Sequence, residues 1–230
     1  MISVDFLYRR VNLDLARLGK SGYTSGEEFN RALSSARVTL YNYYHKLFEE
    51  TKHISEALAP FVKDLTVSVL PNGLLVLPDD YRNRISVAAN VAFNTGCKDD
   101  PEPDTHYQVF EYLKSHEVDQ NLSSPIRKPD LRRRKAYCWL SNESIKIDPI
   151  LSKVNLRYFR EDADAEWAST FDPNTDEETY DATNSTDLDW PEQEKENFVT
   201  LLSLYKGIAV RENALVQFAS SQGFVNQNIN

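Results

Sequence analysis

Residues 65–77 read LTVSVLPNGLLVL, two apolar runs on either side of Pro71-Asn72-Gly73. In the first run apolar and polar residues alternate, which is the period of a β-strand. Asn-Gly between two such runs predicts a hairpin turn, because both residues tolerate positive φ. The stretch therefore predicts a β-hairpin, and it marks the point where a helical pattern gives way to a strand pattern.

The sequence before this hairpin predicts two helices. Residues 3–18 place apolar side chains three and four positions apart, so that they share one helix face. A second apolar stripe begins near Thr24 and continues, with a kink near Thr51, until Pro60 ends it. We expect the two helices to pack as an antiparallel pair. Two overlapping capping boxes fit the start of the second helix, Thr24 with Glu27 and Ser25 with Glu28.

The sequence after the hairpin predicts short antiparallel strands. Turn-forming stretches separate the strand-like runs, which favours antiparallel pairing over strand–helix–strand units. Residues 94–105 and 123–135 are expected to be connecting segments. The alanines of the first run leave a helix open as an alternative there. The runs cover residues 82–93, 107–113, 136–140, 144–147 and 154–159.

Negative charge is concentrated in one segment. The net charge is -9, and residues 161–194 hold 13 acidic residues and no Lys or Arg. Basic residues outnumber acidic ones elsewhere, so the acidity belongs to this segment, and nucleic-acid binding is not the first expectation. Residues 168–188 predict a long exposed loop, because they are rich in Asp, Thr and Asn. Asp189 is suited to begin a helix, and a last helix is expected over 209–221.

Together these patterns predict an α+β protein. Long N-terminal helices and a C-terminal helix pair are expected to form a helical bundle, with a central antiparallel β region between them. The expected segments are N-terminal helices at 1–62, an antiparallel β region at 63–160, an acidic loop at 161–188, a C-terminal helix pair that packs with the N-terminal helices at 189–222, and a frayed tail at 223–230.

No pattern in the sequence predicts a catalytic, cofactor or metal site. Gly19-Lys20-Ser21 resembles the end of a phosphate-binding loop, but Asp14 stands where an earlier glycine is required. Residues 172–183 begin like a calcium loop, but Glu177 and Thr183 occupy the positions that require Gly and Glu. The four histidines and two cysteines lack zinc-site spacing. We therefore predict a protein that is not an enzyme and needs no cofactor.

The cysteine count and the hydropathy pattern bear on the compartment. Two cysteines cannot form a disulfide framework and suit a reducing interior. The longest uncharged apolar run is about half the length of a membrane span. These features predict a soluble protein that is made inside a cell and has no membrane partner.

Basic residues cluster before the strand predicted at 136–140. A solvated loop is the ordinary explanation of such a cluster, and contact with a polyanion or an acidic protein surface is the functional one. The acidic segment of a second copy is complementary in charge, which would favour head-to-tail association into a ring. The predicted subunit interface consists of Arg127, Lys128, Arg132, Arg133, Arg134 and Lys135 on one side and of Asp172, Asp176, Glu177 and Glu178 on the other.

A series of short motifs resembles a family of tailed-phage proteins. In the N-terminal part these are Asp5-Phe6, Val11-Asn12, the loop Gly22-Tyr23-Thr24-Ser25-Gly26, the run Glu27-Glu28-Phe29-Asn30, and Ala36. Later ones are Leu77-Pro78-Asp79-Asp80-Tyr81-Arg82, Ser123-Ser124-Pro125 with Lys128-Pro129, Ile147-Asp148-Pro149, the run from Val154 to Arg160, and Trp167. In their order and spacing they are similar to the ring proteins (head-to-tail adaptors, or neck connectors) of crAss-like and related short-tailed phages.

The resemblance implies a structural virion protein that performs no chemistry. Subunits of that family form a ring, commonly twelvefold, beneath the portal. The implied partners are other copies of the chain, the portal protein, other neck and tail proteins, and passing genomic DNA in transient, non-specific contact. The helices would pack around the channel and dock on the portal, while the β region would offer a platform to the next tail component. The implied location is the virion neck, after synthesis in the host cytoplasm.

Two other functions are left open. The α+β build also fits another virion component, such as a tail terminator, a tail-tube protein or a cargo protein. An enzyme, for example a hydrolase, would have to use the acidic segment, with Asp172, Asp176 and Glu177 as its carboxylates.

Overall fold

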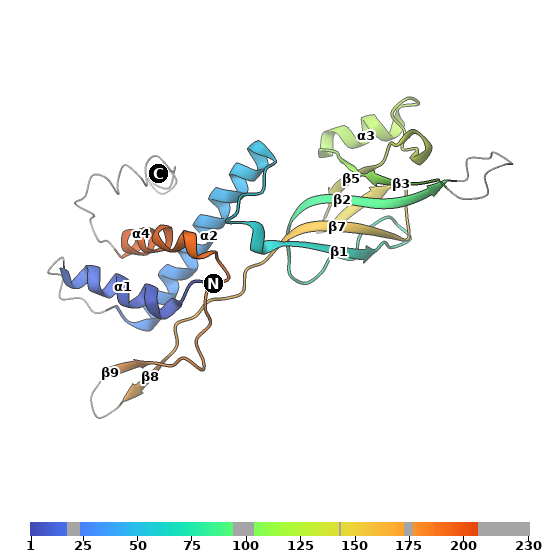
Figure 1. Cartoon of the computed structure of the whole chain (residues 1–230). Helices are drawn as coiled ribbons and strands as arrows, with labels where there is room; N and C mark the ends of the chain where they lie inside the picture. The colour runs from blue at the N-terminus through green and yellow to red at the C-terminus, as the bar shows by residue number, and fades with distance from the viewer. Residues whose placement is uncertain (18–23, 94–103, 143, 173–176, 207–230) are drawn as a thin grey trace. The chain divides into compact units, whose positions relative to one another are not determined.

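The computed structural model describes residues 1–17, 24–93, 104–142, 144–172 and 177–206 (Figure 1). It is an α+β protein, as predicted, with helices and largely antiparallel sheets. The chain divides into two compact units. One, which we call the helical unit, is formed by Met1–Pro60 and Asp162–Asn230, and the other, the β unit, is Phe61–Glu161.

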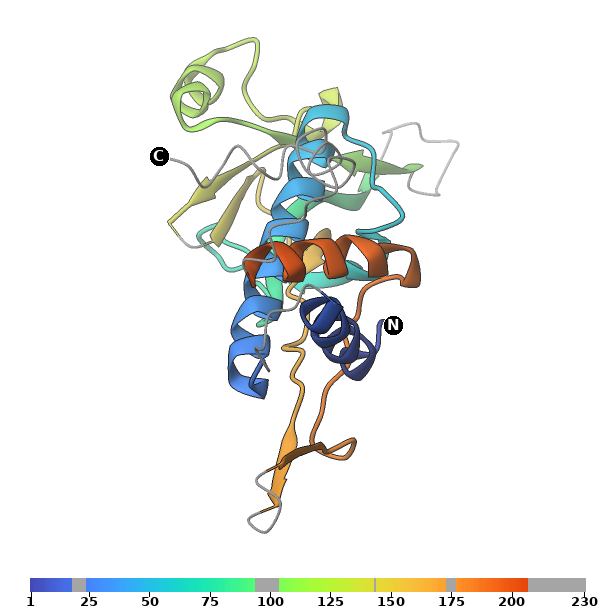
Figure 2. The ribbon, with the colours of Figure 1, turned by 90° about the vertical axis from the view of Figure 1, so that its left-hand side faces the viewer.

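The helical unit is built on three amphipathic helices. They are α1 (Val4–Arg17), α2 (Gly26–Thr51) and α4 (Lys195–Tyr205), the last preceded by the 3-10 turn η3 (Glu192–Glu194). Helix α4 packs against both α1 and α2 (Figure 2). The apolar stripes of the three helices form the core of the helical unit. They include Val4, Leu7 and Val11 of α1, Phe29, Leu33 and Leu40 of α2, and Phe198, Leu201 and Leu202 of α4.

The ends of α2 are set by local hydrogen bonds. The Ser25 hydroxyl accepts from the Glu28 backbone N–H at 3.3 Å, as one of the two predicted capping boxes requires. At the other end, Lys52 adopts the left-handed conformation, with φ at 57°, and its N–H donates to Phe48. The prediction that the helix continues to Pro60 is therefore wrong, because the chain turns away after Thr51.

The acidic region forms a β-arm. Strands β8 (Ser169–Asp172) and β9 (Glu177–Tyr180) pair antiparallel, and a bridge between Glu166 and Thr186 extends the pairing toward the helices. Within the described residues, the prediction of a long loop over 168–188 is therefore wrong, since threonines and aromatic residues at this ladder favour a strand. Both views show the arm extending beyond the helices of its unit (Figures 1 and 2).

The C-terminal region differs from the prediction at its first helix. Pro191, not Asp189, is the N-cap of η3, and α4 follows only at Lys195. Asp189 was expected to begin the helix, but the fixed φ of Pro191 suits the start of the turn after it. The second predicted helix, at 209–221, and the tail at 223–230 lie outside the described residues.

The β unit contains two sheets. One has four antiparallel strands in the order β1-β7-β2-β3, and the other has the order β4-β5-β6 with β4 and β5 parallel. Their facing side chains form a core that includes Val87, Cys138, Ile147 and Leu156. The strands are β1 (Val62–Ser68), β2 (Tyr81–Phe93), β3 (Asp104–Val109), β4 (Glu111–Tyr112), β5 (Tyr137–Ser141), β6 (Ser144–Asp148) and β7 (Lys153–Arg160).

Most of the predicted strands are confirmed, and one short helix was missed. The run predicted at 107–113 is divided between β3, which begins earlier at Asp104, and β4. The strand predictions at 82–93, 136–140, 144–147 and 154–159 correspond to β2, β5, β6 and β7, so the helical alternative for the first is excluded. Helix α3 (Ser115–Ser123) was not predicted. All nine of its residues are at least partly exposed, so it carries no buried apolar stripe that periodicity would reveal.

The hairpin at 65–77 is present but smaller than predicted. Val69 bridges Leu75, and Gly73, with φ at 84°, closes the turn by donating its N–H to the Leu70 carbonyl. Strand β1, however, pairs along its whole length with β7, from Val62 opposite Phe159 to Ser68 opposite Lys153. The second apolar run therefore makes bridges and not a full strand.

Candidate functional site

The basic cluster predicted from the sequence lies in the β unit, in a loop of fixed backbone. We call residues 127–135 the basic loop. Asp130 and Lys135 exchange two backbone hydrogen bonds of 2.9 Å, and the 3-10 turn η2 (Leu131–Arg133) lies between them. The Tyr137 hydroxyl donates to the Arg127 carbonyl at 2.8 Å, and the Gln108 amide donates to the Arg134 carbonyl at 3.2 Å. The loop is therefore held at its start, its middle and its end.

The cationic groups of the basic loop face solvent. Arg127, Lys128, Arg132, Arg133 and Arg134 are exposed, while Lys135 is partly buried and donates to the Ile126 carbonyl. Arg133 lies 3.5 Å from the Asp130 carboxylate, an exposed pair that neutralises little of the charge. A fixed backbone under exposed guanidinium groups lowers the entropy lost on contact with an anionic surface. The loop is thus suited to bind an acidic partner.

The acidic residues of the predicted interface lie in the helical unit, on the β8–β9 arm. The strand register places Asp172 opposite Glu177 at the end of the ladder. Glu178 differs from them, because its carboxylate accepts from the Gly26 N–H at 3.2 Å, at the N-terminus of α2. Asp176 lies outside the described residues. Glu178 therefore anchors the arm to the N-terminus of α2.

The base of the arm is fixed to α1 and α2 through Trp167. Its ring stacks on Tyr8 at a centroid distance of 3.8 Å, and the ring of Tyr180 on β9 stacks at 6.0 Å from it. Its backbone N–H and carbonyl both hydrogen-bond to the Asn30 side chain, at 2.9 and 3.0 Å. A Cβ at Gly26 would lie 2.7 Å from the ring, so only glycine fits there. Three motif residues of the resemblance, Gly26, Asn30 and Trp167, thus meet at one place.

A buried ion pair holds the segment that leads into the arm. Arg37 of α2 donates from Nε to Asp162 at 2.8 Å, and its side chain and that of Asp162 are 8% and 9% exposed. The guanidinium also reaches the carboxylate of Asp164 and the backbone carbonyl of Asp162. Trp190 donates to the same Asp162 carboxylate at 3.5 Å. Because Arg37 and Trp190 donate hydrogen bonds that Asp162 accepts, we assign the cluster a structural role.

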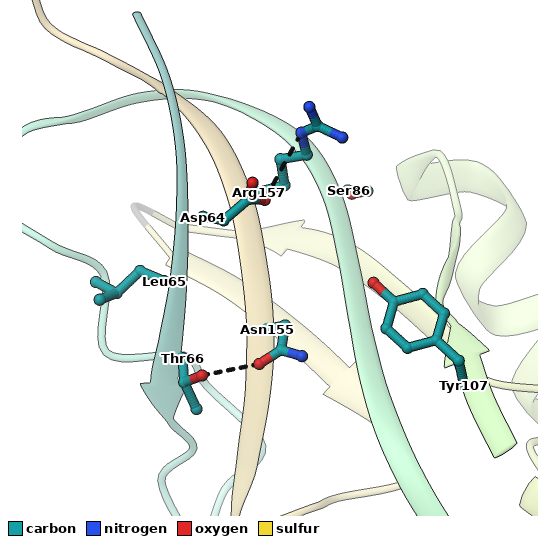
Figure 3. A pocket seen from close by; sticks show the side chains of 7 residues that line it. All are labelled: Asp64, Leu65, Thr66, Ser86, Tyr107, Asn155 and Arg157. Carbon is teal, nitrogen blue, oxygen red and sulfur yellow. Dashed lines mark hydrogen bonds and ion pairs between the residues drawn. The ribbon is translucent and has the colours of Figure 1, made fainter.

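The β unit carries a groove that the sequence did not predict. It occupies about 420 Å³ on the face of the four-stranded sheet that is opposite the core (Figure 3). The small side chain of Ser86 on β2 stands opposite Arg157 of β7 and leaves a hollow beside it. The groove is lined by Asp64, Leu65, Thr66, Ser86, Tyr107, Asn155 and Arg157.

Cross-strand contacts order the polar side chains of the groove. The Thr66 hydroxyl donates to the Asn155 carbonyl oxygen at 2.8 Å, and Arg157 Nε lies 3.6 Å from the Asp64 carboxylate. These pairs stand directly opposite each other on β1 and β7. Polar residues alternate along both strands, which is a sequence signal for a solvent-facing side. The pairing of β1 with β7 joins residues about 90 positions apart in the chain, so local pattern does not reveal it.

Other residues singled out from the sequence have structural surroundings. Cys138 is buried, and burial raises the pKa of its thiol to about 11. His45 stacks on Tyr41 along α2, and His53 and His116 are exposed. Cys97, Gly19-Lys20-Ser21 and residues 173–176 of the calcium-like segment lie outside the described residues. Among the residues that the structure describes, no three His, Cys, Asp or Glu side chains are grouped so as to hold a metal ion.

Comparisons with other proteins do not assign the chain to a family. No protein-family model matches the chain, and no curated protein matches it. None of the described helices combines the length and apolarity that a membrane span requires. The function therefore has to be argued from the surfaces described above.

Proposed function

We propose that the protein is a structural subunit of a phage virion that forms a head-to-tail connector ring. In this role copies of the chain assemble beneath the portal, dock on it, and join it to the tail around the DNA channel. The motif series from Asp5 to Trp167 supports the proposal by its resemblance to neck ring proteins. The helix expected at 209–221 would complete the C-terminal pair and, with α1, α2 and α4, the helical bundle.

The observation that carries the proposal is the anchored, projecting acidic arm. Trp167, Tyr8 and Asn30 fix its base, while Phe171 on β8 remains 59% exposed. A projecting two-stranded sheet is marginally stable alone and exposes apolar surface, which a partner would cover. The basic loop of a neighbouring copy supplies opposite charge on a fixed backbone. The two surfaces differ, so each copy can bind the next and a ring can close.

The proposal is tested with the portal protein encoded in the same genome. The purified chain is mixed with that portal and imaged by electron microscopy. Rings of the chain on the portal end are expected, whereas a monomer in the absence of portal is compatible with the proposal. No binding and no rings would contradict it, and binding to a tail component alone would favour a tail terminator or tail-tube role.

Charge reversal tests the subunit interface. Replacing Arg132, Arg133 and Arg134 by Glu should weaken ring formation, because the attraction between the basic loop and the acidic arm becomes a repulsion. The effect should be largest at low salt, where the repulsion is least screened. The ring population is read from electron micrographs or native mass spectrometry. Adding Asp172→Lys, Asp176→Lys and Glu177→Lys should restore rings by exchanging the signs on both sides.

A control that lowers the net charge by four, against six for the triple arginine variant, separates this effect from net charge. Lys114→Glu with Lys153→Glu changes two exposed lysines of the same unit outside the basic loop, and it should leave rings intact. Unchanged assembly of the triple arginine variant at low salt would reject the interface, even if the chain still binds the portal.

A further inference from the structure

We propose that the groove on the outer face of the four-stranded sheet binds a neutral saccharide. This goes beyond the connector role, since it concerns a ligand site within the β unit alone. The site consists of Asp64, Thr66, Ser86, Tyr107, Asn155 and Arg157, which come from all four strands (Figure 3).

The groove offers unused hydrogen-bonding groups of both kinds. The bond from Thr66 occupies the Asn155 oxygen and leaves the two N–H groups of its amide for a ligand. Within the described residues, the hydroxyls of Ser86 and Tyr107 have no hydrogen-bond partner, and the guanidinium of Arg157 makes an ion pair with Asp64. Figure 3 shows the Asn155 nitrogen and the Tyr107 hydroxyl on two sides of the same space. Sugar hydroxyls, which both donate and accept, match this mixed set.

The charge in the groove argues for a neutral ligand. One guanidinium and one carboxylate, Arg157 and Asp64, lie 3.6 Å apart and largely compensate each other. A phosphate or carboxylate ligand would have to compete with Asp64 for Arg157. A divalent cation would find one carboxylate where it prefers several oxygen ligands.

Tyr107 supplies the apolar part of saccharide recognition. Tyr107 is 61% exposed and stands on β3, at one side of the groove that Ser86 also lines. The face of an aromatic ring carries partial negative charge, so it attracts the weakly positive C–H groups on one face of a sugar ring. A sugar ring could therefore stack on Tyr107 while its hydroxyls form hydrogen bonds with the neighbouring polar side chains.

The size and the scaffold of the groove also fit a small sugar. A volume of about 420 Å³ lies in the range of small-molecule sites. Its side chains stand on paired strands, which hold them more precisely than loops do. A protein partner is a poorer fit, because Leu65 is the single aliphatic residue among those that line the groove, and protein interfaces depend on buried apolar or aromatic anchors.

The test uses the full-length protein on a printed glycan array, followed by saturation-transfer NMR with maltotriose, cellotriose and chitotriose as soluble probes. Binding to at least one neutral glycan is expected. Tyr107→Ala and Asn155→Asp should each weaken it about tenfold, the value of one or two hydrogen bonds or a stacking contact. Asn155→Asp keeps an oxygen that accepts from Thr66, removes the two N–H donors and adds a negative charge, and Tyr107→Phe should retain most of the binding.

Controls make the outcome decisive. Tyr112→Ala removes another exposed tyrosine of the β unit that does not line the groove, so binding should be unchanged. Thermal unfolding of each variant excludes loss of fold as the cause. Absence of binding to every neutral glycan would overturn the proposal. So would binding restricted to sulfated or sialylated glycans and lost in high salt, or self-association that Tyr107→Ala abolishes, which would make the groove a protein interface.

Discussion

The Arg37 guanidinium contributes to stability mainly by compensating a buried carboxylate. Replacing Arg37 by Met should lower the free energy of unfolding by about 3–5 kcal/mol, because Asp162 would remain buried and without its cation. Urea unfolding followed by circular dichroism measures this. Adding Asp162→Asn should recover part of the loss, since the neutral amide still accepts from Trp190.

An exposed arginine of the same helix is the control for Arg37. Arg31 pairs with Glu27 one turn away, and both side chains are about three-quarters exposed, so Arg31→Met should change stability little. Equal effects at Arg31 and Arg37 would contradict the assignment of Arg37 to a buried ion pair.

Cys138 should be inert toward thiol reagents in the folded protein. Burial raises its pKa to about 11, and the reactive thiolate is therefore scarce at pH 8. In a Cys97→Ser variant, labelling of Cys138 at pH 8 should be slow in the native state and fast in denaturant, as read by mass spectrometry. Rapid labelling without denaturant would show that the thiol is accessible.

The same thiol makes stability depend on alkaline pH. The thiol ionises near 9 when unfolded and near 11 when folded, so the unfolded state loses its proton first. The free energy of unfolding should fall as pH rises from 9 to 11, by up to about 1.4 kcal/mol per pH unit. The Cys138→Ala variant is the comparison, and its slope over that window should be shallower.

At the scale of elements, the β8–β9 arm should be dispensable for folding and required for assembly. Replacing residues 172–177 by Asn-Gly would keep residues 169–171 and 178–180 in a short hairpin. It would leave Glu178 at the Gly26 N–H and the stack of Trp167 on Tyr8 in place. We expect helical circular dichroism close to that of the unaltered chain and loss of rings on the portal. Rings that form without the arm would exclude it as the contact element.

A second arm variant separates charge from shape. Asp172→Asn with Glu177→Gln keeps the strands and removes two charges at the end of the ladder. If the basic loop is the partner, assembly should weaken and its salt dependence should flatten.

At the scale of the whole molecule, the β unit should fold by itself. Its ends lie side by side, with Val62 at the start of β1 paired to Phe159 at the end of β7, and it has its own core. A fragment of residues 61–161 should give dispersed amide resonances in an NMR spectrum. Leu156→Asp, which places a charge in that core, should abolish the dispersion. A collapsed, poorly dispersed spectrum of the unaltered fragment would show that it needs the helical unit.

The sequence by itself determined the α+β class and most of the regular elements. The apolar faces of α1 and α2, the Ser25 cap, and the strands β2, β5, β6 and β7 follow from spacing within a few residues. Such patterns are readable because an element must bury one face, and a residue's face depends only on its position in the local repeat. The exposure of the basic loop is likewise a property of composition.

Only the tertiary structure decided the features that join distant parts of the chain. The pairing of β1 with β7, the Arg37–Asp162 ion pair, the anchoring of the acidic arm on Trp167 and the groove between Asn155 and Tyr107 all depend on residues that are far apart in sequence. The sequence predicts a loop in place of the arm because its strands are short and polar. They carry no buried stripe, so the free energy that orders them comes from pairing and from their anchor, which local sequence does not encode.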